Sequence, residues 1–314
     1  MEKKLGLATR DAYGQALAEL GKTNPRIVVL DADLAASTKT GAFGKAFPER
    51  FFNVGIAEMN LVGLAGGLAK AGKTPFISSF ACFLTCKGYD QLRMAVAVPH
   101  ANVKVVTSHG GISVGEDGAS QQSIEDVALM TSLPGFIVSV PSDEHCTRAL
   151  VMQAAALNGP VYIRTGRPKA PLVHEASQSF AFGKGVTLRE GKDVTLIANG
   201  LLVWEALAAA EQLEAAGISA AVVDMHTIKP LDEDLVQRQA ERTGAIVTAE
   251  EHQVWGGLGS AVAQAVARKR PVPMEFVAIQ DTYAESGKPE ELLAKYGLTS
   301  KEIVQAARRA VSRK

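Results

Sequence analysis

The sequence predicts an α/β protein with two domains, each built on a mainly parallel sheet flanked by helices. Short β-branched runs bounded by turn residues alternate with longer Ala- and Leu-rich stretches, as in parallel strands joined by crossover helices. A Pro- and Lys-containing stretch near Pro168–Leu172 interrupts this alternation once. With 314 residues, 47% hydrophobic content and a mean hydropathy of +0.08, the chain can bury the large core that two domains need.

The first half contains the runs that we expect to form the first sheet, and polar or glycine-rich turns follow most of them. The predicted strands are Ile27–Leu30, Pro75–Ile77, Val103–Val106, Phe136–Val140 and Val161–Ile163. In open parallel sheets, ligands bind at the carboxyl ends of the strands. The pattern therefore directs attention to Asp31–Asp33, Ser108–His109 and Arg164, which come at or just after the ends of three of these strands.

The second half repeats the alternation on a smaller scale. We take residues 1–170 as the first domain, 171–185 as a linker that includes the polar run His174–Ser179, and 186–314 as the second domain. The predicted strands of the second domain are Val194–Ile197, Ala221–Val223, Ala245–Val247 and Phe276–Val277, with helices over Val203–Ala216 and after Gly259. The stretch Lys301–Lys314 has apolar residues at helical spacing, which predicts an amphipathic packing helix.

Composition argues against several classes of function. Lys plus Arg and Asp plus Glu number 33 each, so no global field attracts nucleic acid or an anionic membrane. The amino-terminal residues lack the apolar core of a signal peptide, and no run of about 18 apolar residues occurs, so a cytoplasmic location is the default expectation.

Cysteine and histidine spacing predicts no metal site. Cys82, Cys86 and Cys146 form neither a redox CxxC motif nor a zinc-binding series, and we interpret them as reduced thiols. His100, His145, His174, His226 and His252 show no metal-ligand spacing, and we interpret them as structural or surface residues.

A single carboxylate, Glu58, enters an otherwise apolar segment that runs from Val54 into Leu61–Leu68. A buried carboxyl group resists ionisation unless a partner compensates its charge, and proteins use such groups as proton donors or in shared-proton hydrogen bonds. A carboxylate at a helix start can instead simply interact with the helix dipole. From this segment alone, both interpretations stay open.

Two further segments have the character of a binding site. Phe80 and Phe83 lie three residues apart among small neighbours and can stack on a flat heterocycle, although an isolated pair of this kind more often fills the core. The segment His109–Gln122 is too polar and glycine-rich for a core element, so we expect an exposed functional loop. We expect a helix after it, capped by Ser123 with Asp126 at the third position.

Taken together, these segments resemble the carboxyl-side half of transketolases. The motifs Ala8-Thr9-Arg10, Asp31-Ala32-Asp33-Leu34, Gly55-Ile56-Ala57-Glu58, Phe80-x-x-Phe83, Gly115-Glu116-Asp117-Gly118 and Ile163-Arg164 occur in the family's order along essentially the whole chain. The resemblance implies a thiamine-diphosphate-binding fold, with a pyrimidine-binding domain followed by a transketolase C-terminal domain.

The resemblance implies a role for each residue that binds the cofactor. Glu58 would be the catalytic residue, bonding N1′ of the aminopyrimidine and so promoting proton removal from the thiazolium ring. Phe83, with Phe80, would stack on the aminopyrimidine, and Asp33 would lie on the thiazolium side. Gln121 stands where many bacterial members have histidine and animal members similarly have glutamine. It can hydrogen-bond the cofactor or a donor hydroxyl, but it cannot titrate near neutral pH.

The resemblance also implies a set of substrate ligands. Arg10, Ser37, His109 and Arg164 match family positions that bind the phosphate of the sugar, which is a sensible mixture of charged and neutral donors. Asp117 would accept a hydrogen bond from a substrate hydroxyl next to the reacting carbon. The implied reaction is transfer of a two-carbon ketol unit from a ketose phosphate to an aldose phosphate, and the preferred sugars are left open.

A missing motif implies a partner. Full-length members carry an amino-side domain whose Gly-Asp-Gly motif and later asparagine hold Mg²⁺ and the diphosphate, whereas the nearest string here is Glu116-Asp117-Gly118 in the substrate loop. We therefore expect an N-terminal-section subunit that shares the thiamine diphosphate, holds the Mg²⁺ and forms an α2β2 assembly with this chain.

Three other functions compete with this prediction. The β subunit of a 2-oxo-acid dehydrogenase shares the architecture and the glutamate, but the sugar-phosphate residues argue against it. Deoxyxylulose-phosphate synthase is normally one chain that includes the diphosphate domain. A non-catalytic paralogue that serves as a binding subunit is the third, and the presence of Glu58 and the substrate loop argues against it.

Overall fold

The predicted strands of the first half are almost wholly apolar, as expected for strands covered on both faces. In the computed structural model, which describes residues 3–314, they belong to a seven-stranded sheet made of β2 (Ile27–Asp31), β3 (Phe51–Asn53), β4 (Thr74–Ser78), β5 (Lys104–Thr107), β6 (Ile137–Ser139), β7 (Val161–Arg164) and β12 (Thr227–Lys229). The strand order is β12-β6-β7-β5-β4-β2-β3, and only β12 runs antiparallel to its neighbour. The five strands predicted for this half are confirmed.

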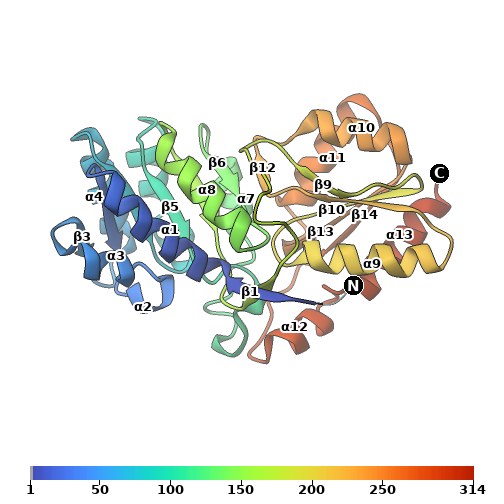
Figure 1. The fold of residues 1–314 in the computed structure, drawn as a ribbon, viewed down its shortest axis with the longest axis horizontal. Coiled ribbons are helices and arrows are strands. Elements are labelled where there is room, and N and C mark those ends of the chain that lie inside the picture. Colours follow the sequence, from blue (N-terminus) through green and yellow to red (C-terminus); the bar gives the residue numbers. More distant parts are fainter. Residues whose placement is uncertain (1–2) are drawn as a thin grey trace.

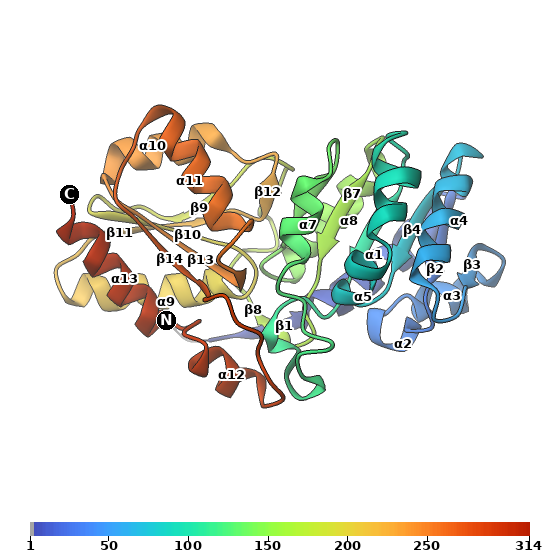
Figure 2. The ribbon, with the colours of Figure 1, turned by 180° about the vertical axis from the view of Figure 1, so that it is seen from behind.

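Helices cover both faces of this sheet. One face packs against α1 (Thr9–Thr23), α3 (Gly41–Ala46) and α8 (Glu144–Ala156), and Figure 1 shows α1 and α8 across its near side. The other face packs against α4 (Glu58–Lys70), α5 (Ala81–Lys87), the π-helical turn Leu92–Ala97 and α7 (Asp126–Ser132), which Figure 2 shows from behind. Short elements lie between them: α2 (Ala35–Thr38), the 3₁₀ turn Pro48–Arg50, α6 (Tyr89–Gln91) and the 3₁₀ turn Ile112–Asp117.

The second half forms a five-stranded sheet from β9 (Val186–Arg189), β10 (Val194–Ala198), β11 (Ala220–Asp224), β13 (Ile246–Gln253) and β14 (Met274–Ile279), in the order β14-β13-β10-β11-β9. Only β9 is antiparallel to its neighbour. One face packs against α9 (Leu202–Ala215) and α13 (Ser300–Ser312), and the other packs against α10 (Glu233–Thr243) and α11 (Leu258–Lys269). α12 (Pro289–Lys295) lies below the junction of the two sheets in Figure 1. The α/β fold class with mainly parallel sheets is therefore confirmed.

The two halves are joined by more than the expected linker. β1 (Leu5–Ala8) pairs with β8 (Lys169–Pro171), and β12 from the second half adds an edge strand to the first sheet beside β6. Within the segment expected as a linker, His174 is buried and its Nε2 lies 2.7 Å from Asp224 Oδ2. The backbone N–H of His174 donates to Asp143 Oδ2 of the first half at 3.0 Å, so the linker is packed against both halves. Its boundaries stay a prediction.

The parallel register brings the ends of the central strands to one edge of the first sheet. Asp31, Ser78, Thr107 and Arg164 are the last residues of β2, β4, β5 and β7. The turns that follow carry most of the residues predicted for the site, including Asp33, Phe80 and His109. This edge of the first sheet is therefore the candidate site.

Candidate functional site

Glu58 is the first residue of α4 and its side chain is only 4% exposed. The nearest cation is Lys87 at the end of α5, whose Nζ lies 3.8 Å from Glu58 Oε2. The carboxylate is thus both buried and at a helix start, so the helix dipole and one lysine compensate its charge. Its position allows the catalytic interpretation, which stays a prediction.

A platform of three aromatic rings lies near Glu58. The rings of Phe80 and Phe83 are 5.5 Å apart at 19°, and His109 stacks on Phe80 at 3.7 Å and 20°. Lys87 Nζ lies 4.7 Å from the centre of the Phe83 ring, so the lysine that pairs with Glu58 also contacts the platform. Near-parallel rings of this kind suit a flat heterocycle.

His109 connects the ring platform to a polar region. Its backbone has a φ of +60°, its side chain is buried, and Nδ1 lies 2.7 Å from Ser108 Oγ. Its other nitrogen, Nε2, lies 4.0 Å from Asp117 Oδ2. Burial, with Arg10 and Arg167 nearby, lowers the pKa of His109 to about 3, so the imidazole is neutral at physiological pH.

Two arginines make this polar region cationic. Arg10 follows β1 at the start of α1, is half-buried, and donates from Nη1 to the carbonyl of Ser37 at 3.2 Å. Arg167 donates from Nη1 to Glu116 Oε2 at 2.8 Å and to the carbonyl of Val114. Burial lowers the pKa of Arg10, and Arg167 acts in the same direction, as expected for two guanidinium groups that share one region.

Arg167 is a residue that the sequence analysis missed. It lies three residues beyond Arg164 in the turn after β7, and its side chain is 34% exposed. Its presence beside a strand end is the same signal that selected Arg164. Only the folded structure distinguishes the roles of the two arginines, because the exposure of their side chains differs.

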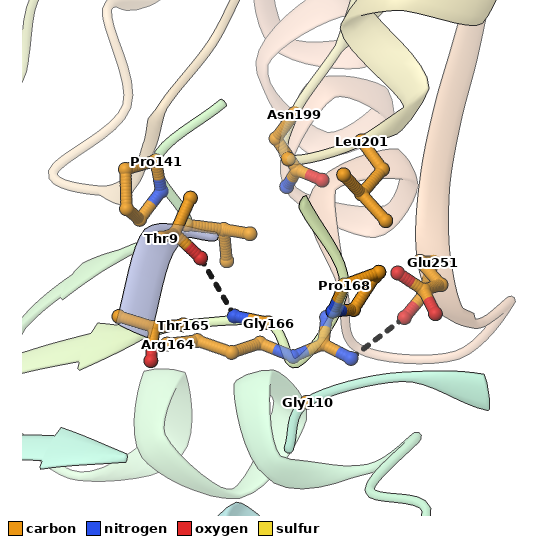
Figure 3. Close-up of a pocket in the computed structure, with 12 residues that line it drawn as sticks. Thr9, Gly110, Pro141, Arg164, Thr165, Gly166, Pro168, Asn199, Leu201 and Glu251 are labelled. Carbon is orange, nitrogen blue, oxygen red and sulfur yellow. Dashed lines mark hydrogen bonds between the residues drawn. The ribbon is translucent and has the colours of Figure 1, made fainter. Parts of the chain in front are cut away.

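Arg164 differs from the other predicted phosphate ligands. Its side chain is 4% exposed, and Nη2 donates to the carbonyls of Ser123 at 2.9 Å and Glu251 at 2.8 Å. Its Nε lies 3.3 Å from Asp126 Oδ2. Figure 3 shows the guanidinium directed toward Glu251, beside a cavity of about 30 Å³ between the two halves. The guanidinium of Arg164 is therefore occupied by contacts within the protein.

The remaining predicted residues surround the same edge. Asp33 is exposed with a φ of +64° and accepts a hydrogen bond from Asn53 Nδ2 at 2.8 Å. Ser37 lies on α2, in a turn anchored by the buried Asp31, which accepts bonds from Thr38 and Thr40. The half-buried Gln121 accepts a bond from Ser120 Oγ at 2.5 Å.

The expected cap at Ser123 is wrong. α7 begins at Asp126 without a side-chain cap, and Ser123 Oγ has no hydrogen-bond partner within residues 3–314. Instead the carbonyl of Ser123 accepts bonds from Gly111 N and Arg164, because this residue belongs to the base of the loop.

From residue 3 onward, no group of three or more His, Cys, Asp and Glu side chains is placed to hold a metal ion. Across the same residues, no helix combines the length and apolar character needed to cross a bilayer. All three cysteines are free thiols, as predicted.

Comparisons with known proteins assign both halves of the chain to one family. Residues 6–172 match the pyrimidine binding domain of transketolase, and residues 183–303 match the transketolase C-terminal domain. A putative transketolase C-terminal section from Methanocaldococcus jannaschii is 44% identical over 94% of this chain and 94% of its own length. The 6-deoxy-6-sulfo-D-fructose transketolase subunit SqwH of a Clostridium species is 45% identical over 97% of this chain and 95% of its own length.

Longer relatives and solved structures agree with this assignment. Human transketolase is 42% identical over 98% of this chain, which spans 49% of that protein. A solved structure described as "Split gene transketolase, inactive beta4 tetramer" is 52% identical, with a TM-score of 0.93 over 98% of this chain and 100% of its own. Motif order, strand topology and both domain matches thus point the same way: the chain belongs to the transketolase family, of which it carries the pyrimidine-binding and C-terminal domains.

Proposed function

We propose that this chain is one subunit of a thiamine-diphosphate-dependent split transketolase that moves a two-carbon ketol unit from a ketose phosphate to an aldose phosphate. One observation carries the proposal. Glu58, the platform of Phe83, Phe80 and His109, and the cationic region of Arg10 and Arg167 follow one another along the carboxyl edge of one sheet. A carboxylate, a ring platform and a phosphate-binding region are what the cofactor and a sugar phosphate require.

The side chains present fit the aminopyrimidine part of thiamine diphosphate. A buried carboxylate can bond the ring nitrogen N1′, and the near-parallel phenylalanine rings offer a stacking surface. When bound, the cofactor supplies the nucleophilic carbon that cleaves the bond beside the ketose carbonyl. Glu58 would share a proton at N1′, Phe83 and Phe80 would orient the ring, and Asp33 and Gln121 would border the site.

We assign the sugar phosphate to Arg10, Ser37, His109 and Arg167. Two guanidinium groups provide the charge, and a neutral His109 donates one hydrogen bond without adding charge. Arg167 takes the place expected for Arg164, since Arg164 already bonds two carbonyls in a buried site. Asp117, which is 35% exposed and faces His109, would accept a hydrogen bond from a substrate hydroxyl.

A second subunit would complete the site. Large apolar side chains are exposed on the segment that carries Glu58 and on its surroundings: Phe52 43%, Ile56 79%, Met59 58% and Leu64 46%. Such a patch marks a protein interface. We propose that an N-terminal-section subunit docks here in an α2β2 assembly, sharing the thiamine diphosphate and holding the Mg²⁺. The description of a related β tetramer as inactive supports a requirement for that partner. The cytoplasmic location stays a prediction.

The test is ketol transfer from xylulose 5-phosphate to ribose 5-phosphate with thiamine diphosphate and Mg²⁺. The chain is assayed alone and co-expressed with an N-terminal-section subunit. We expect activity only in the pair and its loss in Glu58→Ala, whereas Glu49→Ala, which removes an exposed glutamate, leaves it unchanged. A well-formed pair that is inactive with every donor would favour a non-catalytic subunit, and turnover of 2-oxo acids instead would favour a 2-oxo-acid dehydrogenase.

A separate comparison is needed to identify the sugar donor. A relative that is 45% identical is named for a sulfonated sugar, 6-deoxy-6-sulfo-D-fructose. A sulfonate is an oxyanion that the same arginines can bind, although it carries one charge fewer than a phosphate dianion. The assay therefore compares fructose 6-phosphate with 6-deoxy-6-sulfofructose, and the larger kcat/KM identifies the donor class.

A further inference from the structure

The loop that carries His109 and Asp117 rests on the C-terminal domain. Within this loop, His109–Gln122, three glycines have positive φ: Gly111 at 82°, Gly115 at 83° and Gly118 at 77°. These are conformations that other residues rarely adopt, so the loop has a defined path. The path is closed at its base, where Gly111 N donates to the carbonyl of Ser123 at 2.7 Å.

Glu251 from β13 contacts this loop directly. The residue is 7% exposed, and its Oε1 accepts a hydrogen bond from the backbone N–H of Ser113 at 2.5 Å. Its carbonyl accepts Arg164 Nη2, which also donates to the carbonyl of Ser123 (Figure 3). Glu251 thus holds the middle of the loop through its carboxylate and the base of the loop through Arg164.

The fit between the loop and these two side chains is close. A Cβ added at Gly111 would lie 2.2 Å from the Glu251 carboxyl group, and one added at Gly110 would lie 2.0 Å from Arg164 Nε. Such distances leave room only for glycine. The loop backbone is therefore seated on Glu251 and Arg164, with no intervening side chain at either position.

Charge explains why these buried groups remain paired. Burial disfavours the Arg164 guanidinium, but the acidic groups around it, led by the carboxylates of Asp126 and Glu251, outweigh this effect and raise its pKa. Burial likewise raises the pKa of Glu251, and Arg164 opposes that rise. Removing one partner would leave a buried charge without compensation, which costs far more than the pair contributes.

A second group of contacts holds the C-terminal part of the loop, from Gly115 to Gln122. Gln122 Nε2 donates to the carbonyl of Glu285 at 3.0 Å, and it also bonds the carbonyl of Gly115 at 3.2 Å. A Cβ added at Gly118 would lie 2.5 Å from Ser286 Oγ. The C-terminal domain thus supports the loop at its middle, its base and its C-terminal part.

We propose that Glu251 is a positioning residue for the reaction, through which the C-terminal domain holds the loop so that His109 and Asp117 face the substrate. The proposal deepens the proposed function and rests on it for its kinetic part. Its structural part is independent, because the hydrogen bond from Ser113 N to Glu251 exists without substrate or partner.

Hydrogen exchange of the chain alone tests the structural part. In Glu251→Ala we expect amide exchange across the peptide that covers residues 110–123 to be about tenfold faster, since one bond to a charged acceptor is lost. The matched control is Glu250→Ala: this neighbour accepts bonds from Leu258 N at 2.7 Å and Gly259 N at 2.8 Å, inside the C-terminal domain. Unchanged exchange of the loop in Glu251→Ala, or equal acceleration in Glu250→Ala, would overturn the proposal.

Kinetics of the assembled pair test the functional part. Glu251→Ala should raise KM for phosphorylated donors about tenfold, while kcat/KM for hydroxypyruvate, a ketol donor that offers Asp117 a hydroxyl but offers His109 no phosphate, should fall by a smaller factor. Glu251→Gln, which keeps the acceptor oxygen, should show loop protection and a KM close to those of wild type. If the alanine variant does not fold, Glu251→Asp takes its place, because its shorter side chain keeps the charge but withdraws the acceptor oxygen from Ser113 N. Equal losses with both donors would refute positioning. Inactivity of the wild-type pair combined with faster loop exchange would refute only the proposed function.

Discussion

Lys104 offers a quantitative test of the fold because it is a fully buried cation that the proposed chemistry does not use. It begins β5, and its Nζ donates to the carbonyls of Leu157 at 3.0 Å and Gly159 at 2.6 Å. Burial lowers the pKa of Lys104 from 10.5 to about 7. The two carbonyls thus satisfy its hydrogen bonds without neutralising its charge.

The sign of the resulting pH dependence follows from proton linkage. Between pH 7 and pH 10.5 the unfolded chain keeps a proton on Lys104 that the folded chain releases, so the stability contribution rises with pH in this window. Below pH 7 both states are protonated and the full penalty, roughly 5 kcal/mol, is present. From pH 7 to pH 9 this one group should increase the free energy of unfolding by about 2 kcal/mol.

The perturbation is Lys104→Met, which keeps the volume and removes the charge, and Lys192→Met at an exposed position is the control. Urea unfolding at pH 6, 7, 8 and 9 gives the free energy of unfolding of each variant. The free energy of unfolding of Lys104→Met minus that of wild type should fall by about 2 kcal/mol between pH 7 and pH 9. The two carbonyls that lose their donor add the same cost at every pH, so they do not change this difference. Parallel pH curves for wild type and Lys104→Met would refute the buried, pKa-shifted lysine.

Three further predictions concern the site and its interface. Arg167→Ala should raise KM for phosphorylated donors about 10- to 100-fold with little change for hydroxypyruvate, and an equal loss with both donors in steady-state assays would contradict its role. Because the pKa of His109 is lowered to about 3, the step in KM at about pH 6 that the second ionisation of the donor phosphate produces should be the same in wild type and in His109→Asn; an additional step that disappears in His109→Asn would show that the histidine titrates there. Ile56→Asp, at a side chain that is 79% exposed, should abolish co-purification with the N-terminal-section subunit at unchanged melting temperature, whereas Leu157→Asp, 38% exposed at the end of α8, should not.

Strand positions were predictable because they depend on local pattern. The runs Ile27–Leu30 and Val161–Ile163 are continuous, β-branched and apolar, and the fold buries them on both faces as the pattern requires. β13 is longer than predicted, since Ile246–Gln253 continues through two glutamates and a histidine. All three are buried: Glu251 and His252 accept hydrogen bonds across the junction, and Glu250 accepts them within the C-terminal domain, which only tertiary structure provides.

The site was predictable in outline and not in detail, for a physical reason. The carboxyl edge of the sheet follows from strand order, and the family motifs identify Glu58 and the loop. Arg164 and Arg167 have the same charge and nearly the same position in sequence, and only burial assigns one to the loop base and the other to the open region. Ser123 likewise has a side chain that can cap a helix, but its carbonyl instead accepts a hydrogen bond from Arg164 at the base of the loop.

The antiparallel pairing of β12 with β6 has a consequence for how this chain can be divided. A fragment that ends at the linker would lack Thr227–Lys229, and β6 would then offer a row of unpaired backbone groups to any other strand. We expect such a fragment to aggregate, although its helices and central strands are complete. The two domains of this chain therefore form a unit that cannot safely be cut at the linker.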